Sequence, residues 1–171
     1  MKKMAIAVVL MIASGATLAF DVDGYRSGMT PGQVAAMADR QGLDMWQMAD
    51  VPGDWAIGIR AQYRIDATFA FCAPAGLFAY AHSLDPDNAY LPAVERTIAA
   101  WGQPKVSVQR VAWSGPGGGD IQSIDMLWKR GDGTELSISF TPEGRDGAGA
   151  LRYNRGTSIS YIDRSRVCPT H

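Results

Sequence analysis

The side chains best suited to nucleophilic or metal-binding chemistry are few in this chain. It contains two cysteines, Cys72 and Cys168, and two histidines, His82 and His171, and no histidine is adjacent to a cysteine. No Gly-x-Ser-x-Gly, Ser-x-x-Lys or His-Glu-x-x-His motif is present to set a nucleophile beside a base or two histidines on one metal ion. We therefore predict no catalytic residue, no metal site and no cofactor, and we favour binding over catalysis.

Acid–base pairs of carboxylates stay open, because such pairs form in space and leave no motif. The chain has three glutamates, Glu95, Glu135 and Glu143. Each lies in a sequence context typical of an exposed residue. Three arginines alternate with apolar residues on predicted strands, namely Arg60, Arg64 and Arg110. Arginines and acids that line a pocket define the alternative function, a small periplasmic hydrolase or ligand-binding protein.

The two cysteines suggest a structural disulfide. An even pair in an exported protein usually closes one, and neither cysteine has the neighbours of a redox or metal motif. A bridge between Cys72 and Cys168 would close a long loop, for which the chain-entropy model gives roughly 4–5 kcal/mol. We predict this disulfide, with two free thiols as the alternative.

The first nineteen residues have the layout of a secretory signal peptide. Lys2 and Lys3 give a positive start, residues 4–12 are uncharged and mostly apolar, and Thr17 and Ala19 are small residues before a cleavage site. The apolar run is too short to span a bilayer, which needs about 20 residues. We predict a signal peptide over residues 1–19 and a soluble periplasmic or secreted protein beginning at Phe20.

Composition indicates one globular domain, residues 20–171. Hydrophobic residues make up 47% of the chain and charged residues 19%, as in a folded protein. The formal net charge is −1, and loss of two lysines with the leader makes it more negative. Nucleic acid and anionic membranes attract proteins with a basic excess, so neither is expected as a partner.

Local signals predict two helices, each followed by strands. Thr30 and Gln33 can form a capping box around Pro31, and Gly42 can end that helix. A second apolar face at helical spacing ends at Trp101, and residues 85–88 are expected to cap its start. Strands are predicted from the alternating residues of 55–71, then at 77–82, 106–113, 121–129, 135–140 and 158–162.

This order predicts an α+β fold, an antiparallel sheet with two helices on one face. The same order in both halves is compatible with a tandem helix-then-strands repeat, with half-repeats 20–84 and 85–171. Between two strands, the glycine-rich run 115–119 is expected to be a flexible loop. It lacks the lysine and hydroxyl of a phosphate-binding loop.

The segment Gly28-Met29-Thr30, with Val34 four residues after the threonine, resembles a pattern in small exported bacterial proteins of the outer-membrane assembly lipoprotein type, the SmpA/OmlA (BamE) family. Their helical unit often ends in Leu-Gly-x-Pro, and residues 101–104 are similar. Secreted folds like β-lactamase inhibitor protein are built from tandem helix-then-sheet units. The resemblance implies such a fold in an exported binding protein. It does not carry over the lipid tether, because the residue directly after the predicted cleavage site is Phe20 and not a cysteine.

The candidate binding residues are Trp46, Met48 and Trp55. The two tryptophans flank residues 47–54, which are expected to form a loop, and an exposed loop of this kind would suit a protein-binding patch. The alternative is that both tryptophans close the edge of the core. The leading hypothesis is thus a non-enzymatic binding module that holds a protein partner as an inhibitor, immunity factor or envelope-assembly accessory. It would use this loop or one sheet face.

Overall fold

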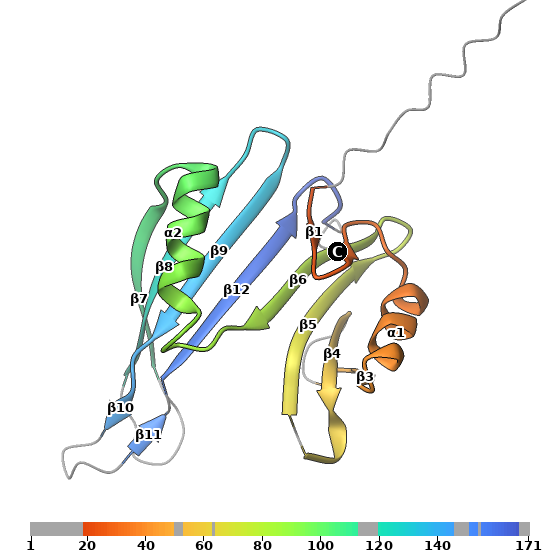
Figure 1. Ribbon diagram of the computed structural model, residues 1–171, viewed down its shortest axis with the longest axis horizontal. Coiled ribbons are helices and arrows are strands. Elements are labelled where there is room, and N and C mark those ends of the chain that lie inside the picture. Colours follow the sequence, from red (N-terminus) through yellow and green to blue (C-terminus); the bar gives the residue numbers. More distant parts are fainter. Residues whose placement is uncertain are drawn as a thin grey trace, which may run out of the picture.

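The body of the molecule is an eight-stranded antiparallel sheet with strand order β3-β4-β5-β6-β12-β9-β8-β7 (Figure 1). The computed structural model describes residues 19–49, 53–62, 64–112, 120–145, 151–153 and 155–167. The sheet strands are β3 (Asp44–Gln47), β4 (Asp54–Ile59), β5 (Arg64–Cys72), β6 (Gly76–Ser83), β7 (Lys105–Ala112), β8 (Asp120–Lys129), β9 (Thr134–Thr141) and β12 (Gly156–Asp163). Two short hairpins add β1 (Asp21–Val22) with β2 (Tyr25–Arg26) and β10 (Gly144–Arg145) with β11 (Leu151–Tyr153).

The chain passes twice through the same order of elements. Helix α1 (Pro31–Arg40) precedes β3 to β6, and helix α2 (Tyr90–Trp101) precedes β7, β8, β9 and β12. The last strands of the two halves, β6 and β12, pair at the centre of the sheet, and the first strands form its two edges. The predicted helix-then-strands order is therefore found in both halves, with the β10–β11 hairpin added in the second.

Helix α1 begins where the capping residues predict. The Gln33 backbone N–H donates to Thr30 Oγ1, and the Thr30 N–H donates to Gln33 Oε1 at 2.8 Å. This reciprocal arrangement satisfies two donors that the first turn of a helix leaves open. Val34 and Ala38 are buried on the face toward the sheet. The Gly28–Val34 motif thus forms the turn and cap that start α1.

Helix α2 also matches its predicted end at Trp101, but its start differs from the prediction. The N-cap is Ala89, which forms no side-chain capping bond. Asp85 lies further upstream and accepts the backbone N–H groups of Asp87 and Asn88, at 2.8 and 3.2 Å. The carboxylate therefore closes a turn before the helix, because its side chain reaches backbone only two or three residues away.

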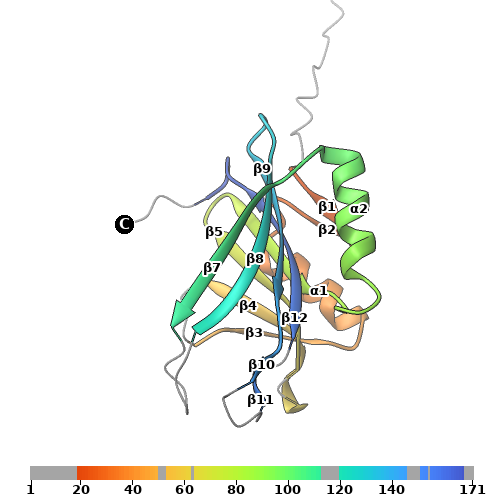
Figure 2. The same ribbon diagram turned by 90° about the vertical axis from the view of Figure 1, so that its left-hand side faces the viewer.

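Both helices cover the same face of the sheet, as predicted, and no helix of the described residues lies on the opposite face (Figure 2). The core forms two clusters on the covered face. The first, around Phe69, Leu77 and Val34, lies under α1; the second, around Trp128 and Ile138, lies under α2. Tyr161 on the central strand β12 packs against both clusters. No helix in the described part of the chain is long and apolar enough to cross a membrane.

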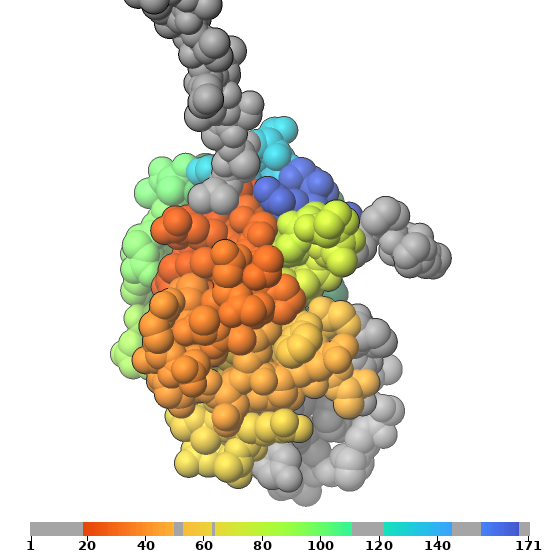
Figure 3. All heavy atoms as spheres, turned by 90° about the vertical axis from the view of Figure 1, so that its right-hand side faces the viewer, coloured from red at the N-terminus to blue at the C-terminus, as the bar shows by residue number. Residues whose placement is uncertain are grey.

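The segment from Phe20 to Met29 covers the junction between the halves. In Figure 3 it lies between α2 and the turn before β6. Phe20 and Tyr25 are 5% and 2% exposed, so the segment belongs to the core. Its end is fixed to β6, since the Gly28 N–H donates to Leu77 O and the Leu77 N–H donates to Met29 O, at 2.8 and 2.7 Å. This close contact between the segment and the start of β6 requires glycine at position 76, where a Cβ would lie 2.5 Å from the Gly28 carbonyl oxygen.

Most predicted strands are present, with two differences in the first half. The long alternating stretch is divided, as its glycines suggest, and a short 3-10 helix at Arg60–Gln62 separates β4 from β5. Strand β3 and the hairpin β1–β2 are additional. They are too short for alternation to mark them, and their pairing partners decide their conformation. Trp113 and the 115–119 loop lie outside the described residues.

Candidate functional site

Trp46 and Trp55 lie on neighbouring strands but face opposite sides of the sheet. Trp46 in β3 pairs with Ala56 in β4, and Gln47 pairs with Trp55. Paired residues share a face, and successive residues alternate. Trp55 packs against the cluster under α1, as the core-edge alternative expects. Trp46 therefore lies on the helix-free face, and the two rings do not form one patch.

Met48 follows β3 directly and is half-buried. Its backbone N–H donates to Asp54 O at 2.9 Å, so it extends the β3–β4 pairing by one residue. Residues 50–52 of the predicted loop lie outside the described residues. The predicted site residues are thus divided between a core position and an edge strand.

A hollow of about 300 Å³ lies beside Trp46 at the edge of the sheet. Its lining residues are Trp46, Gln47, Ala49, Arg60 and Ile65. The Ile65 side chain comes from β5, where a bulge opposite Ile57 and Gly58 shifts the register, and it is 43% exposed. We call this feature the Trp46 hollow. It combines an indole, an exposed aliphatic side chain and a cation next to an edge strand.

From Trp46, the helix-free face continues across the sheet through small side chains. The row runs through successive partners Ala56, Thr68, Ala81, Ser160 and Ser137. Ala56 is fully buried, whereas the other four residues of the row are half-buried. Their small side chains protrude little from the sheet, so another chain could approach the strands closely between Thr68 and Ser137. The covered face carries the large core residues instead.

The carboxylates and arginines singled out from the sequence do not converge on one site. Glu135 is 7% exposed, so the expectation of an exposed context is wrong for this residue. Its oxygens bind Lys129 and Arg164, at 2.5 and 2.8 Å. Burial raises its pKa, but the hydrogen bonds from these two cations outweigh burial and lower the net pKa. Glu135 is thus a structural ion-pair residue.

The three arginines are also dispersed. Arg60 lies at the Trp46 hollow, and its backbone N–H donates to Asp44 Oδ2 at 3.1 Å. Arg64 at the start of β5 pairs with Asp66 at 2.8 Å. Arg110 lies on β7, the edge strand at the other end of the sheet. They do not line a common pocket.

Cys72 ends β5 and is 6% exposed, while Cys168 lies outside the described residues. No cysteine of the described part of the chain is free. The chain after β12 approaches this region, since Arg166 Nη1 donates to the Ala75 carbonyl at 3.0 Å in the turn after β5. The Cys72–Cys168 disulfide stays a prediction.

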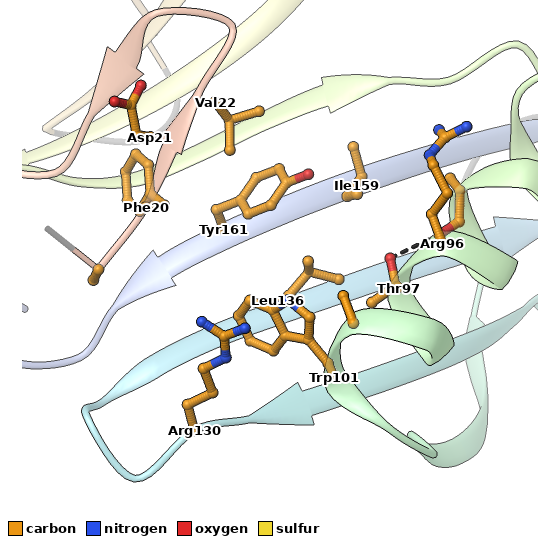
Figure 4. Close-up of a pocket in the computed structure, with 13 residues that line it drawn as sticks. Phe20, Asp21, Val22, Arg96, Thr97, Trp101, Arg130, Leu136, Ile159 and Tyr161 are labelled. Atoms are coloured by element: carbon orange, nitrogen blue, oxygen red, sulfur yellow. Dashed lines mark hydrogen bonds between the residues drawn. The ribbon is translucent and has the colours of Figure 1, made fainter.

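A pocket of about 360 Å³ lies on the covered face where the two core clusters meet (Figure 4). Leu136, Ile159 and Tyr161 form its floor, α2 forms one wall, and the segment 19–22 forms the other. The α2 wall is mostly of small residues, which leave the space open, together with Trp101. We call this feature the interhelical pocket. Nothing in the local sequence marks it, because its walls come from four separate segments.

Two cations lie at opposite ends of the interhelical pocket. Figure 4 shows Arg96 of α2 at one end and Arg130, from the turn between β8 and β9, at the other. The Arg130 guanidinium lies 3.8 Å from the centre of the Trp101 ring, a cation–π contact. Neither arginine forms an ion pair with a described residue. The acid at the rim, Asp21, is held by Arg26 at 2.9 Å.

The Tyr161 hydroxyl points toward the Arg96 end of the pocket (Figure 4). Burial raises the pKa of this phenol, the carboxylate of Asp23 adds to the rise, and Arg96 opposes it. The phenol therefore stays protonated and can donate a hydrogen bond. Thr97 is already satisfied, since its hydroxyl donates to the Ala93 carbonyl at 2.8 Å.

Comparisons with protein-family models, with curated proteins and with solved structures found no match for this chain. The candidate sites are therefore interpreted from their geometry.

Proposed function

We propose that this chain is an exported, non-enzymatic binding module that holds a protein partner at the β3 edge of its sheet. The Trp46 hollow is the observation that carries the proposal. A tryptophan beside an exposed isoleucine gives a partner's side chain an apolar place to insert, and aromatic residues are frequent energetic centres of interfaces. An inhibitor, an immunity factor and an envelope-assembly accessory all act in this way.

The edge position of β3 supports the same proposal. Among the described strands, β3 pairs with β4 alone and forms one edge of the sheet. An extended peptide can add to such an edge, with backbone hydrogen bonds giving affinity and neighbouring hollows giving specificity. The half-buried small side chains from Thr68 to Ser137 would let a partner contact the helix-free face as well. The proposal of export rests on residues 1–19. The resemblance to assembly lipoproteins rests on the Gly28–Val34 motif.

Site-specific crosslinking in the native organism tests this interface. The photoreactive residue p-benzoylphenylalanine is placed at position 46, at position 65, or at the control position 91, where Leu91 is an exposed apolar residue of α2 (66% exposed). We expect one partner to crosslink at 46 and 65 and not at 91. Equal yields at all three positions would remove the proposed interface.

The purified partner then allows a measurement of affinity. Trp46→Ala should weaken binding about tenfold or more, since such residues often contribute over 1 kcal/mol. Leu91→Ala is the matched control and should bind as the unmodified protein does. The alternative function, a ligand-binding protein, is favoured by a different observation, the interhelical pocket.

A further inference from the structure

We propose that the interhelical pocket binds an elongated amphipathic dicarboxylate, with an apolar middle and an acidic group at each end. This site is independent of the β3 edge and lies on the opposite face of the sheet. It rests on the distribution of charge and apolar surface around one cavity. The ligand class follows from three features of that cavity.

The first feature is the polarity of the groups that a ligand would meet. The polar side-chain groups of the pocket that form no hydrogen bond or ion pair with a described side chain are the guanidiniums of Arg96 and Arg130 and the hydroxyl of Tyr161. All three are hydrogen-bond donors, and two are positively charged. A ligand that matches them must present acceptors and negative charge. Carboxylates meet this need because a guanidinium can bind both carboxylate oxygens at once.

The second feature is the apolar floor. Leu136, Ile159 and the ring of Tyr161 lie between the two arginines, and Trp101 faces them from α2 (Figure 4). Ala100 of α2 also lines the pocket. A small polar anion such as acetate would leave this surface in contact with water. A hydrocarbon or aromatic middle would cover it, and burial of apolar surface favours binding by ~25 cal/mol per Å².

The third feature is the separation of the cations. Arg96 and Arg130 lie at opposite ends of the floor, so a ligand that contacts both extends along the floor (Figure 4). A ligand with an acidic group at each end pairs with both guanidiniums. Tyr161 adds a donor at the Arg96 end. The volume of about 360 Å³ is within the range of small-molecule sites.

Isothermal titration calorimetry of the protein purified after export tests the proposal with three probes of equal chain length. These are decanedioate, decanoate and 1,10-decanediol, which carry two, one and no carboxylates. We expect decanedioate to bind most tightly and the diol most weakly. Equal affinities for decanedioate and the diol, or no binding of any probe, would overturn the proposal.

Substitutions locate the site. Arg96→Gln and Arg130→Gln should each weaken decanedioate binding about tenfold, since each removes one charge-assisted contact. They should leave decanoate less affected, because it can use the remaining arginine. Arg40→Gln, in the exposed last turn of α1, is the control and should bind as the unmodified protein does. Affinity unchanged in both pocket variants would place the binding elsewhere.

A further variant separates the pocket from general attraction to positive charge. Ala100 is exposed and lines the pocket, so Ala100→Phe should fill the space while both arginines remain. We expect it to abolish decanedioate binding without lowering the unfolding temperature by more than a few degrees. Retained binding in this variant would contradict a ligand inside the pocket.

Discussion

The carboxylate of Glu135 accepts a hydrogen bond from Arg164 Nε at 2.8 Å and lies almost fully buried at the start of β9. Its second oxygen binds Lys129 across the β8–β9 pair. The contact with Arg164 ties the chain after β12 to β9. A carboxylate in this position connects three segments of the second half.

Glu135 should make stability depend on pH at the acid end. Its pKa is lower in the folded protein than in the unfolded chain, where a glutamate titrates near ~4.3. The stabilisation is therefore fully present above about pH 4.3. It is lost as the pH falls through the folded pKa. Glu135→Gln should lower the free energy of unfolding at pH 7 by roughly 1 kcal/mol, because both cations are half-exposed.

Urea denaturation at pH 7 and at several values below pH 5 measures this effect. Glu95→Gln is the control, since Glu95 is exposed on α2. A Glu135→Gln protein that loses stability with falling pH as steeply as the unmodified protein would show that Glu135 is not responsible.

Tyr80 should make the stability of the protein depend on pH at alkaline values. Its hydroxyl donates to Asp23 Oδ2 at 3.1 Å and the ring is 3% exposed. Burial, followed by the negative charge of Asp23, raises its pKa well above the ordinary value of 10. The folded protein thus favours the protonated phenol, so this stabilisation is present below pH 10 and is lost as the pH rises further.

Tyr80→Phe should cost about 1 kcal/mol at pH 7, because it removes a hydrogen bond to a charged group that is itself exposed. It should also reduce the loss of stability above pH 10. Tyr90→Phe is the matched control, because burial raises the pKa of Tyr90 but its hydroxyl forms no hydrogen bond with a described residue. Thermal unfolding at pH 7 and pH 10.5 compares the two variants, and equal effects would argue against the Asp23 contact.

Substitution of two glycines by alanine should change the stability of the protein in opposite directions. A Cβ at Gly58 would lie 2.0 Å from the backbone oxygen of Arg64, in the β4–β5 bulge. Gly58→Ala must displace backbone and should destabilise the protein by ~2 kcal/mol or more. A Cβ at Gly32 in α1 meets nothing within 4 Å, and Gly32→Ala should stabilise by up to ~1 kcal/mol. Chemical denaturation measures both, and a neutral Gly58→Ala protein would contradict the close approach.

The predicted disulfide should be measurable as an absence of thiols. Under non-reducing, denaturing conditions, we expect the purified protein to show no reaction with a thiol reagent and to gain two thiols after reduction. A Cys72→Ser, Cys168→Ser double variant should lose up to about 4 kcal/mol of stability, as expected for a long loop. Two reactive thiols in the unreduced protein would disprove the bridge.

Local signals in the sequence predicted the helices and most strands well. The Thr30–Gln33 box fixed the start of α1, because its hydrogen bonds join residues three apart. Alternation identified strands such as β9, where Leu136 and Ile138 lie on the buried face. The same reasoning failed for Glu135. Its ion-pair partner Arg164 lies 29 residues further along the chain, and local sequence does not show that the two residues meet.

The candidate sites were less accessible to such reasoning. Trp46 was identified, but strand β3 was not, and the register of β3 against β4 decides that Trp46 and Trp55 face opposite sides. The interhelical pocket was missed, although an arginine spaced five residues before Trp101 on an amphipathic helix was visible in the sequence.

The sequence alone determined the class of fold, the start of α1 and the end of α2, because propensity, capping and hydrophobic periodicity act over a few residues. Only the tertiary structure decided which segments meet. The pairing of β6 with β12 joins the two halves, and the Phe20–Met29 segment covers the junction between them. Arg96 and Arg130 come to one cavity through these long-range contacts, whose free energy depends on packing across the whole sheet.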